Sequence, residues 1–248
     1  MSRVLCVANQ KGGVGKTTTA VNLATGLSVA GHSSLLVDLD PRCSATLSLG
    51  QGSAACHPLL SAEPLSKSVL LTGTSGLDLL PGSPACDWIE ELSDADSGAA
   101  QTFSRQLSSG SAAYDFVLID CPPSLGSLTE TALSVSTEVL MPIQCEYFAM
   151  EGLTQMIHVI RRVMSRPTNE LQFGGILLTM YDHQLKLTNE LDREVREFFG
   201  EIVFDTVIPR DVAVVEAPSH GKSVIDYSPR SRGTRAYVEL CMEVLDRE

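Results

Sequence analysis

The chain has 248 residues, and its 18 lysines and arginines against 30 aspartates and glutamates give a formal net charge of −12. With 44% hydrophobic and 19% charged residues, it has the composition of a folded globular protein, which excludes a disordered chain. The acidic excess excludes nucleic-acid binding through an overall positive charge, so any such contact needs a local basic patch.

No segment has the sequence of a secretion signal or of a membrane span. The apolar run at residues 4–8 is shorter than the hydrophobic region of a signal peptide. No run approaches the roughly 18 apolar residues of a membrane helix. The seven cysteines lie at least 13 residues apart, so the CxxC spacing of metal and redox sites is absent. We therefore expect a cytoplasmic protein with reduced thiols and no membrane contact.

Short apolar runs alternate with segments of helical periodicity along the chain. Strands are predicted at residues 4–8, 35–38, 77–80, 116–120, 139–143, 176–179 and 203–208. Helices are predicted at residues 17–30, 129–136, 150–164, 187–199 and 234–245. Several strands are apolar at nearly every position, which is typical of a parallel sheet covered on both faces. We expect an α/β fold in which residues 1–248 form a single domain, with one doubly wound, mostly parallel sheet and helices on both faces.

Two regions rich in serine, alanine, glycine and proline interrupt this alternation, at residues 51–68 and 93–113. We interpret both as variable surface connections rather than as linkers between domains, because neither half of the chain completes a sheet by itself.

A glycine-rich segment lies between the first predicted strand and the first predicted helix. Its sequence is Lys11-Gly12-Gly13-Val14-Gly15-Lys16-Thr17-Thr18. The backbone N–H groups of such a loop point inward and bind phosphate oxygens, together with the positive end of the following helix. We predict that Lys16 reaches the β- and γ-phosphates of ATP and that the Thr17 hydroxyl binds Mg²⁺. The alternative, a glycine turn without a ligand, is disfavoured by the Gly-Lys-Thr sequence in this context.

Aspartates follow two further predicted strands. Asp38 ends the strand predicted at residues 35–38 and Asp40 follows it two residues later, and Asp120 ends the strand at residues 116–120. Open α/β sheets bind ligands beyond the carboxyl ends of their strands. Carboxylates there can hold Mg²⁺ or orient a water in line with the γ-phosphate. Strand alternation predicts that Asp38 and Asp40 share a face.

The loop departs from the general phosphate-loop pattern, because Gln10 stands where a glycine is usual and Lys11 adds a second lysine. In this the chain resembles the ParA/MinD class of P-loop ATPases. Its similarity to the chromosomal ParA/Soj subfamily extends over residues 9–27, 35–47, 114–128, 144–153, 175–180 and 208–233.

The resemblance implies a deviant-Walker domain that forms a homodimer around two ATP molecules, with Lys11 of each copy reaching the phosphates of the other. It implies that Asp40 positions the hydrolytic water and that Asp38 lies near the metal. Mg²⁺ would be arranged by Thr17, Asp40 and Asp120, and the adenine would be held by the segments that contain Met180, Pro209 and Asp211. The implied function is slow ATP hydrolysis, with release of ADP, that drives cycling on nucleoid DNA. A ParB-type partner would stimulate it to segregate a chromosome or plasmid.

Two departures from the subfamily pattern bear on function. The subfamily typically has Asp-Pro-Gln-Gly-Asn after the second strand, where this chain has Asp40-Pro41-Arg42-Cys43-Ser44. This change concerns the rate of hydrolysis rather than nucleotide binding. Positions that commonly carry DNA-binding arginines hold Gln184 and Ala213. Nearby cations could substitute for them: Lys186, Arg210, Lys222, Arg230, Arg232 and Arg235. We expect DNA binding to be weak and salt-sensitive, or absent.

Two functions therefore remain open. One is partition on DNA with a ParB-type partner, and the other is an orphan positioning or regulatory ATPase that acts through a protein partner with little or no DNA binding. A third class, a metabolic P-loop enzyme such as an amide-forming ligase, would need a small-molecule site that the sequence does not reveal. Membrane cycling of the MinD type is disfavoured because residues 237–248 are rich in acids rather than basic.

Overall fold

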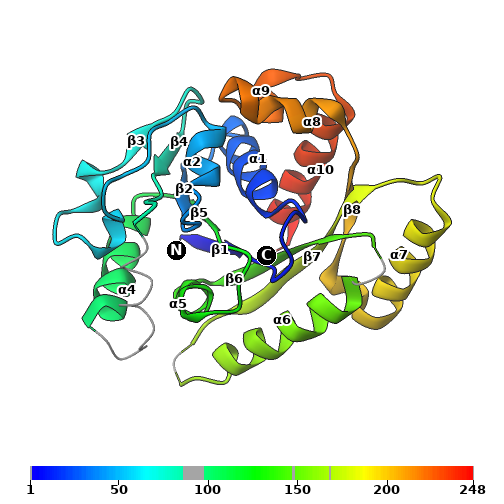
Figure 1. The fold of residues 1–248 in the computed structure, drawn as a ribbon, viewed down its shortest axis with the longest axis horizontal. Helices are drawn as coiled ribbons and strands as arrows, with labels where there is room; N and C mark the ends of the chain where they lie inside the picture. The colour runs from blue at the N-terminus through cyan, green and yellow to red at the C-terminus, as the bar shows by residue number, and fades with distance from the viewer. Residues whose placement is uncertain (1, 86–97, 147–148, 168, 248) are drawn as a thin grey trace.

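The computed structural model describes residues 2–85, 98–146, 149–167 and 169–247. Its centre is an eight-stranded sheet of order β3-β4-β2-β5-β1-β6-β7-β8 (Figure 1). The neighbouring strands pair in parallel, except that β3 pairs antiparallel with β4. The strands are β1 (Arg3–Val7), β2 (Ser34–Asp38), β3 (Leu70–Leu71), β4 (Leu77–Leu80), β5 (Phe116–Asp120), β6 (Glu138–Gln144), β7 (Gln172–Tyr181) and β8 (Val203–Pro209).

The seven predicted strands are confirmed, and the predicted doubly wound α/β fold with them. Missing from the prediction was β3, a two-residue strand at the edge of the sheet. A strand this short leaves no alternation in the sequence to detect.

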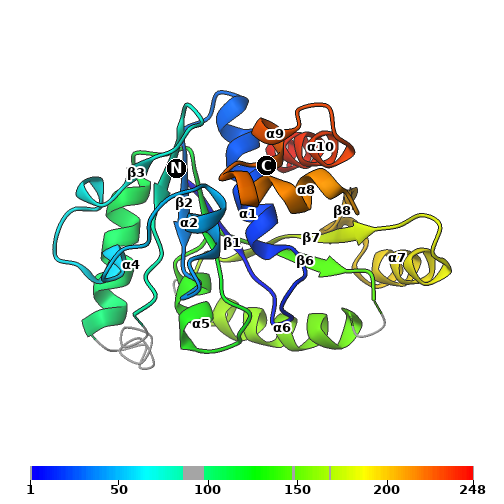
Figure 2. The same ribbon diagram turned by 45° about the horizontal axis from the view of Figure 1, so that its top comes forward.

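Helices cover both faces of the sheet. On one face lie α1 (Lys16–Val29), α2 (Ser44–Ser48), α8 (Val212–Glu216), α9 (Val224–Tyr227) and α10 (Arg232–Asp246). On the other lie α4 (Gly98–Ser111), α5 (Ser127–Ser134), α6 (Ala149–Met164) and α7 (Lys186–Phe199) (Figures 1 and 2). Alternation along the strands divides the core accordingly. In β1, Val4 and Cys6 join the cluster under α4 to α7, whereas Leu5 and Val7 join the cluster under α1 and α10.

Helix α10 faces this core, as expected from its sequence. Tyr237, Leu240 and Val244 are buried against the sheet, and the Tyr237 hydroxyl lies 3.5 Å from Thr19 Oγ1 of α1. No helix of the described part of the chain is long and apolar enough to cross a membrane.

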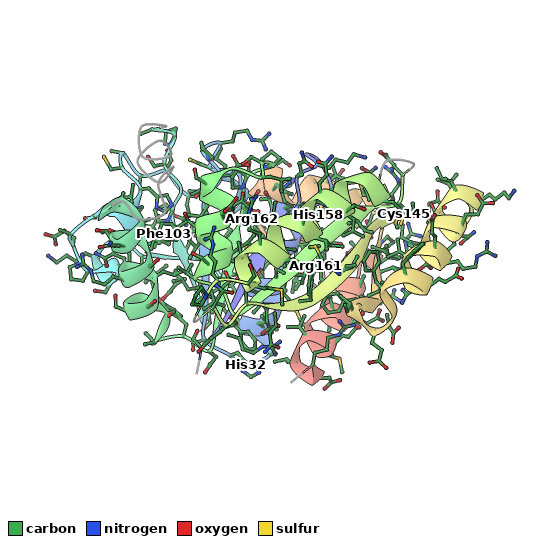
Figure 3. All side chains as sticks on the ribbon, turned by 90° about the horizontal axis from the view of Figure 1, so that it is seen from below. His32, Phe103, Cys145, His158, Arg161 and Arg162 are labelled. Atoms are coloured by element: carbon green, nitrogen blue, oxygen red, sulfur yellow. The ribbon has the colours of Figure 1, made fainter. Side chains whose placement is uncertain are left out.

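One predicted connection is in fact a helix. Residues 98–111 form α4, in which Phe103 and Leu107 lie one turn apart and are fully buried in the core (Figure 3 labels Phe103). The interpretation of residues 93–113 as a surface connection is therefore wrong for α4, and residues 93–97 lie outside the described residues. Because the segment is rich in serine and glycine and has few large apolar residues, its helical periodicity was not recognised in the sequence.

The segment at residues 51–68 is also more than a surface connection. It contains two short 3₁₀ helices, Pro58–Leu60 and Leu65–Lys67, whose Leu59 and Leu65 are buried. Leu65 packs closely against Gly110 of α4, so the two regions cover the same edge of the core together.

We expect Phe103→Ala to lower the free energy of unfolding by about 3–5 kcal/mol, because it leaves a cavity under α4. Urea denaturation followed by circular dichroism measures this loss. Gln101→Ala, an exposed change on the same helix, is the control and should lie within about 0.5 kcal/mol of the wild type. Equal effects of the two substitutions would contradict the packing of α4.

Candidate functional site

The glycine-rich loop joins β1 to α1 at the carboxyl ends of the central strands (Figure 2, dark blue). Gly13 and Gly15 have φ angles of 77° and 90°, and Gly15 precedes the first residue of α1. L side chains rarely adopt this left-handed conformation, so these two glycines allow the tight turn. The turn brings Lys16 to the N-terminal end of a fourteen-residue helix, where the helix dipole favours an anion.

Lys16 is buried in this loop, and its Nζ donates a hydrogen bond to the carbonyl oxygen of Lys11 at 2.9 Å. Burial lowers the pKa of Lys16, whereas the negative charge of Asp120 acts against this shift. A buried ammonium bonded to a neutral carbonyl has gained little for its lost hydration. It is therefore well suited to an anionic ligand such as a phosphate.

Lys11 makes a different contact. Its Nζ lies 2.9 Å from Glu146 Oε2, which follows β6, and both side chains are partly exposed. Its backbone N–H donates to Asn9 Oδ1 at 3.0 Å. In this structure the extra lysine is thus paired within its own chain.

Asp120 ends β5 and is completely buried, and neither of its carboxylate oxygens has a hydrogen-bond partner among the described residues. Burial raises its pKa well above the usual value, and the nearby Asp38 raises it further. The neighbouring Thr17 hydroxyl and Lys16 act in the opposite direction. An unpartnered buried carboxylate is costly and is explained by a ligand that the folded chain alone does not supply.

The residues around Asp120 fit a magnesium ion. Mg²⁺ prefers oxygen ligands and is usually bound through one or two carboxylates together with phosphate oxygens and water. Asp120 and Thr17 provide such oxygens beside the phosphate loop. In the described part of the chain, no group of three or more histidines, cysteines, aspartates or glutamates could hold a metal by itself. Water and the oxygens of a bound phosphate would complete the coordination of a cation here.

Asp38 and Asp40 bind different groups. Asp38 pairs with Asp120 across the sheet, but its own Oδ2 accepts hydrogen bonds from the N–H and hydroxyl of Thr46, at 2.8 and 2.7 Å. Its Oδ1 accepts the Asp40 N–H at 3.1 Å. Burial raises the pKa of Asp38, and these hydrogen bonds oppose that shift. Asp38 therefore anchors α2 to the end of β2.

Asp40 lies beyond β2 and is also nearly buried. Its carboxylate is held by Arg42, whose backbone N–H donates to Oδ1 at 2.9 Å and whose Nη2 donates to Oδ2 at 3.0 Å. This contact was not predicted, because a sequence does not show which way the side chain of Arg42 turns.

A cavity of about 510 Å³ adjoins the phosphate loop. It is lined by the three residues predicted to hold the adenine, Met180, Pro209 and Asp211, and also by Gly15, Thr18, Val212, Arg232 and Tyr237. Met180 has a φ angle of 51°, which is strained for a residue other than glycine. The Asp211 side chain accepts N–H hydrogen bonds from Ala213 and Gly233, so it holds α8 and α10 together rather than pointing freely at a ligand.

A larger cavity of about 890 Å³ lies at the other end of the strands, by the first residues of β1, β5 and β6. Its arginines are already occupied: Arg3 binds Glu138 and Arg247 binds Glu243. The phosphate loop lies far from this end, so we place the functional site at the smaller cavity.

The six cations of the predicted basic patch are all exposed. Five of them lie on or between adjoining segments, because Arg210 precedes α8 and Lys222, Arg230, Arg232 and Arg235 follow it up to the first turns of α10. Lys186 lies on α7, apart from α8 and α9 in both views, and is paired with Glu190 at 3.3 Å (Figures 1 and 2). The structure therefore supports a patch of five rather than six.

Comparison with known proteins gives consistent results. The model of a family described as an AAA domain matches residues 2–173. The chain is 42% identical to the chromosome partitioning protein ParA of Caulobacter vibrioides, covering 99% of this chain and 95% of that protein. It is 40% identical to the sporulation initiation inhibitor protein Soj of Bacillus subtilis, covering 98% of each.

Solved structures show the same fold. Cobyrinic acid a,c-diamide synthase from Mycobacterium smegmatis, with bound ADP and magnesium, has a TM-score of 0.84 at 33% identity, over 99% of this chain and 94% of that one. The cell division ATPase MinD of Pyrococcus furiosus has a TM-score of 0.82 at 26% identity, over 100% of both chains.

We expect Asp120→Asn to stabilise the protein in the absence of nucleotide and divalent cations. The raised pKa means that folded Asp120 holds its proton more tightly than the unfolded chain does. Its ionisation therefore costs stability, increasingly as the pH rises above the unfolded value of about 3.9. The free energy of unfolding at pH 7 should increase by about 1–2 kcal/mol, and the gain should disappear in acid.

Asp115→Asn is the matched control for this measurement. Hydrogen bonds from Ser33 lower the pKa of the exposed Asp115. That substitution should give no gain. If Asp120→Asn behaved in the same way, the carboxylate would not be the uncompensated charge that the structure shows.

Proposed function

The chain belongs to the ParA/Soj family of P-loop ATPases, and on this premise we propose that it is an ATP-switched partitioning protein. In this proposal it dimerises around two ATP molecules, hydrolyses them slowly, and cycles on nucleoid DNA under stimulation by a ParB-type partner. The observation that carries the proposal is the buried Asp120, whose carboxylate accepts no hydrogen bond within distance in the described part of the chain, beside Lys16 and Thr17 of the phosphate loop.

Nucleotide binding follows from the loop. The N–H groups of Gly12 to Thr18 and the start of α1 would hold the phosphates, and Lys16 would exchange the Lys11 carbonyl for the β- and γ-phosphates. The adenine would occupy the cavity lined by Met180 and Pro209. Magnesium held by Asp120 and Thr17, with Asp40 nearby, would neutralise phosphate charge.

Hydrolysis and dimerisation depend on two further residues. Asp40 would orient the attacking water, for which it needs an accessible carboxylate oxygen. Lys11 would leave Glu146 and bind the phosphates of the other copy. The internal pair is partly exposed, so breaking it costs at most about 1 kcal/mol.

A second candidate function is an ATPase that works without DNA. The absence of arginine at Gln184 and Ala213 and the net charge of −12 favour an orphan ATPase that acts through a protein partner. The patch of five exposed cations between Arg210 and Arg235 favours DNA. A related diamide synthase has the same fold, so the fold alone does not separate partition from amidation, but the higher identity to partitioning proteins favours partition.

We expect the wild type and Asp40→Ala to dimerise in ATP and Mg²⁺, with Asp40→Ala accumulating as the dimer because it does not consume ATP. Gly12→Val should bind ATP but stay monomeric. Among the described residues, a Cβ at Gly12 would meet Pro123 alone, at 3.9 Å, so the monomer tolerates a side chain that a crowded dimer contact would not. Size-exclusion chromatography with light scattering measures the states.

Lys16→Ala is the control for this experiment and should lose nucleotide binding altogether. Monomeric behaviour of both the wild type and Asp40→Ala in ATP would contradict the sandwich dimer.

We expect DNA binding that requires ATP and weakens as salt increases. Each phosphate contact removed, for example in Arg230→Ala or Arg235→Ala, should lower the slope of log affinity against log salt by about one. Arg161→Ala is the matched control, because this exposed arginine lies on α6, on the opposite face of the sheet (Figure 3). Binding measured by fluorescence anisotropy at low salt distinguishes the candidates: none in ATP would favour the orphan ATPase.

A further inference from the structure

The contact between Arg42 and Asp40 has a geometry that bears directly on the site. The backbone of residues 40–43 forms a closed turn, in which the Cys43 N–H donates to the Asp40 carbonyl at 2.7 Å. Within this turn Arg42 contributes three donors to Asp40: its backbone N–H, Nε and Nη2, at distances of 2.9 to 3.3 Å. The fork of the guanidinium matches the two carboxylate oxygens.

The two partners differ sharply in exposure. The Asp40 side chain is 4% exposed, whereas that of Arg42 is 69% exposed. The guanidinium therefore lies on the solvent side of a nearly buried carboxylate. Water that is to be oriented by Asp40 must use an oxygen that Arg42 now occupies, and beside a positive charge that oxygen is a weaker acceptor.

The conformation of the turn fits the subfamily pattern, but its side chain at position 42 does not. Cys43 has φ 54° and ψ 40°, a left-handed conformation that glycine adopts without strain. The subfamily pattern Asp-Pro-Gln-Gly-Asn places a glycine at this position, so the turn has the conformation that the pattern implies. What differs is the side chain at position 42, a forked cation in place of a neutral amide.

We propose that Arg42 is a built-in brake on ATP hydrolysis. It is a positioning residue that holds Asp40 away from the attacking water, and hydrolysis proceeds only from the fraction of molecules in which the guanidinium has left the carboxylate. This inference rests on the proposed role of Asp40. Because Arg42 is largely exposed, the contact is weakened by solvent, so the closed form is favoured by a factor of only about one and a half to five.

The test is steady-state ATP hydrolysis by the full chain with ATP and Mg²⁺. Arg42→Gln, which restores the subfamily residue, should raise kcat about two- to sixfold and leave KM and ATP affinity unchanged. Arg42→Lys keeps the charge but loses the fork, so it should fall between the two. Arg161→Gln, at an exposed arginine of α6, is the matched control and should behave as the wild type.

A second measurement separates a brake from a general structural effect. Because the contact is an exposed ion pair, added salt should narrow the difference in kcat between the wild type and Arg42→Gln, whereas a structural effect of the substitution would not be screened. Thermal unfolding of each variant shows whether the fold is intact. A fall in kcat in Arg42→Gln would show that the arginine assists hydrolysis and would overturn the brake, as would an unchanged kcat.

Failure of the brake is distinguishable from failure of the proposed function. If Asp40→Ala hydrolyses ATP as fast as the wild type, the role assigned to Asp40 is wrong. If Asp40→Ala is inactive and Arg42→Gln is not faster than the wild type, the role of Asp40 stands and the brake alone is wrong.

Discussion

The site depends on one constraint, which is that a fully buried strand ends in a carboxylate whose oxygens have no hydrogen-bond partner within distance among the described residues. β5 is buried at every position, and Asp120 lies at its last residue, opposite Asp38 on β2. Two acids at adjoining strand ends are stable only when other groups take up their charge. Asp38 obtains this from the N–H and hydroxyl of Thr46, whereas Asp120 depends on Lys16 and on what binds the loop. The burial of this strand end therefore favours either a protonated Asp120 or a cation beside its carboxylate.

The fold and the turn of the glycine-rich loop were predictable because their signals are local. Gly13 and Gly15 mark the turn before α1, and the apolar run before Asp120 marks β5, each within a few residues. Helix α4 was not predictable in this way, since only Phe103 and Leu107 mark its buried face among serines and glycines. Its helical state depends on packing against Leu65, a contact between segments far apart in sequence.

Side-chain partners within the site were also beyond the sequence. Alternation predicted one face for Asp38 and Asp40, but the strand ends at Asp38, and the following turn gives Asp40 a different set of neighbours. Asp211 was predicted at the adenine and does line that cavity, yet its carboxylate is used to join α8 to α10. A sequence pattern predicts where such residues lie. It does not predict which of their oxygens are already hydrogen-bonded, because those bonds come from turns and helix caps.

The pairing of Lys11 with Glu146 has a consequence for how two copies would meet. Each copy carries a charge of −12, and the lysine that would attract the other copy is neutralised by its own chain. Encounter between copies would therefore be slowed by mutual repulsion, and dissolved ions that screen it would speed assembly. The same ions weaken contacts with a polyanion. If the chain forms such a dimer on DNA, assembly and DNA attachment would respond to ionic strength in opposite directions, and the DNA-bound dimer would be confined to an intermediate range.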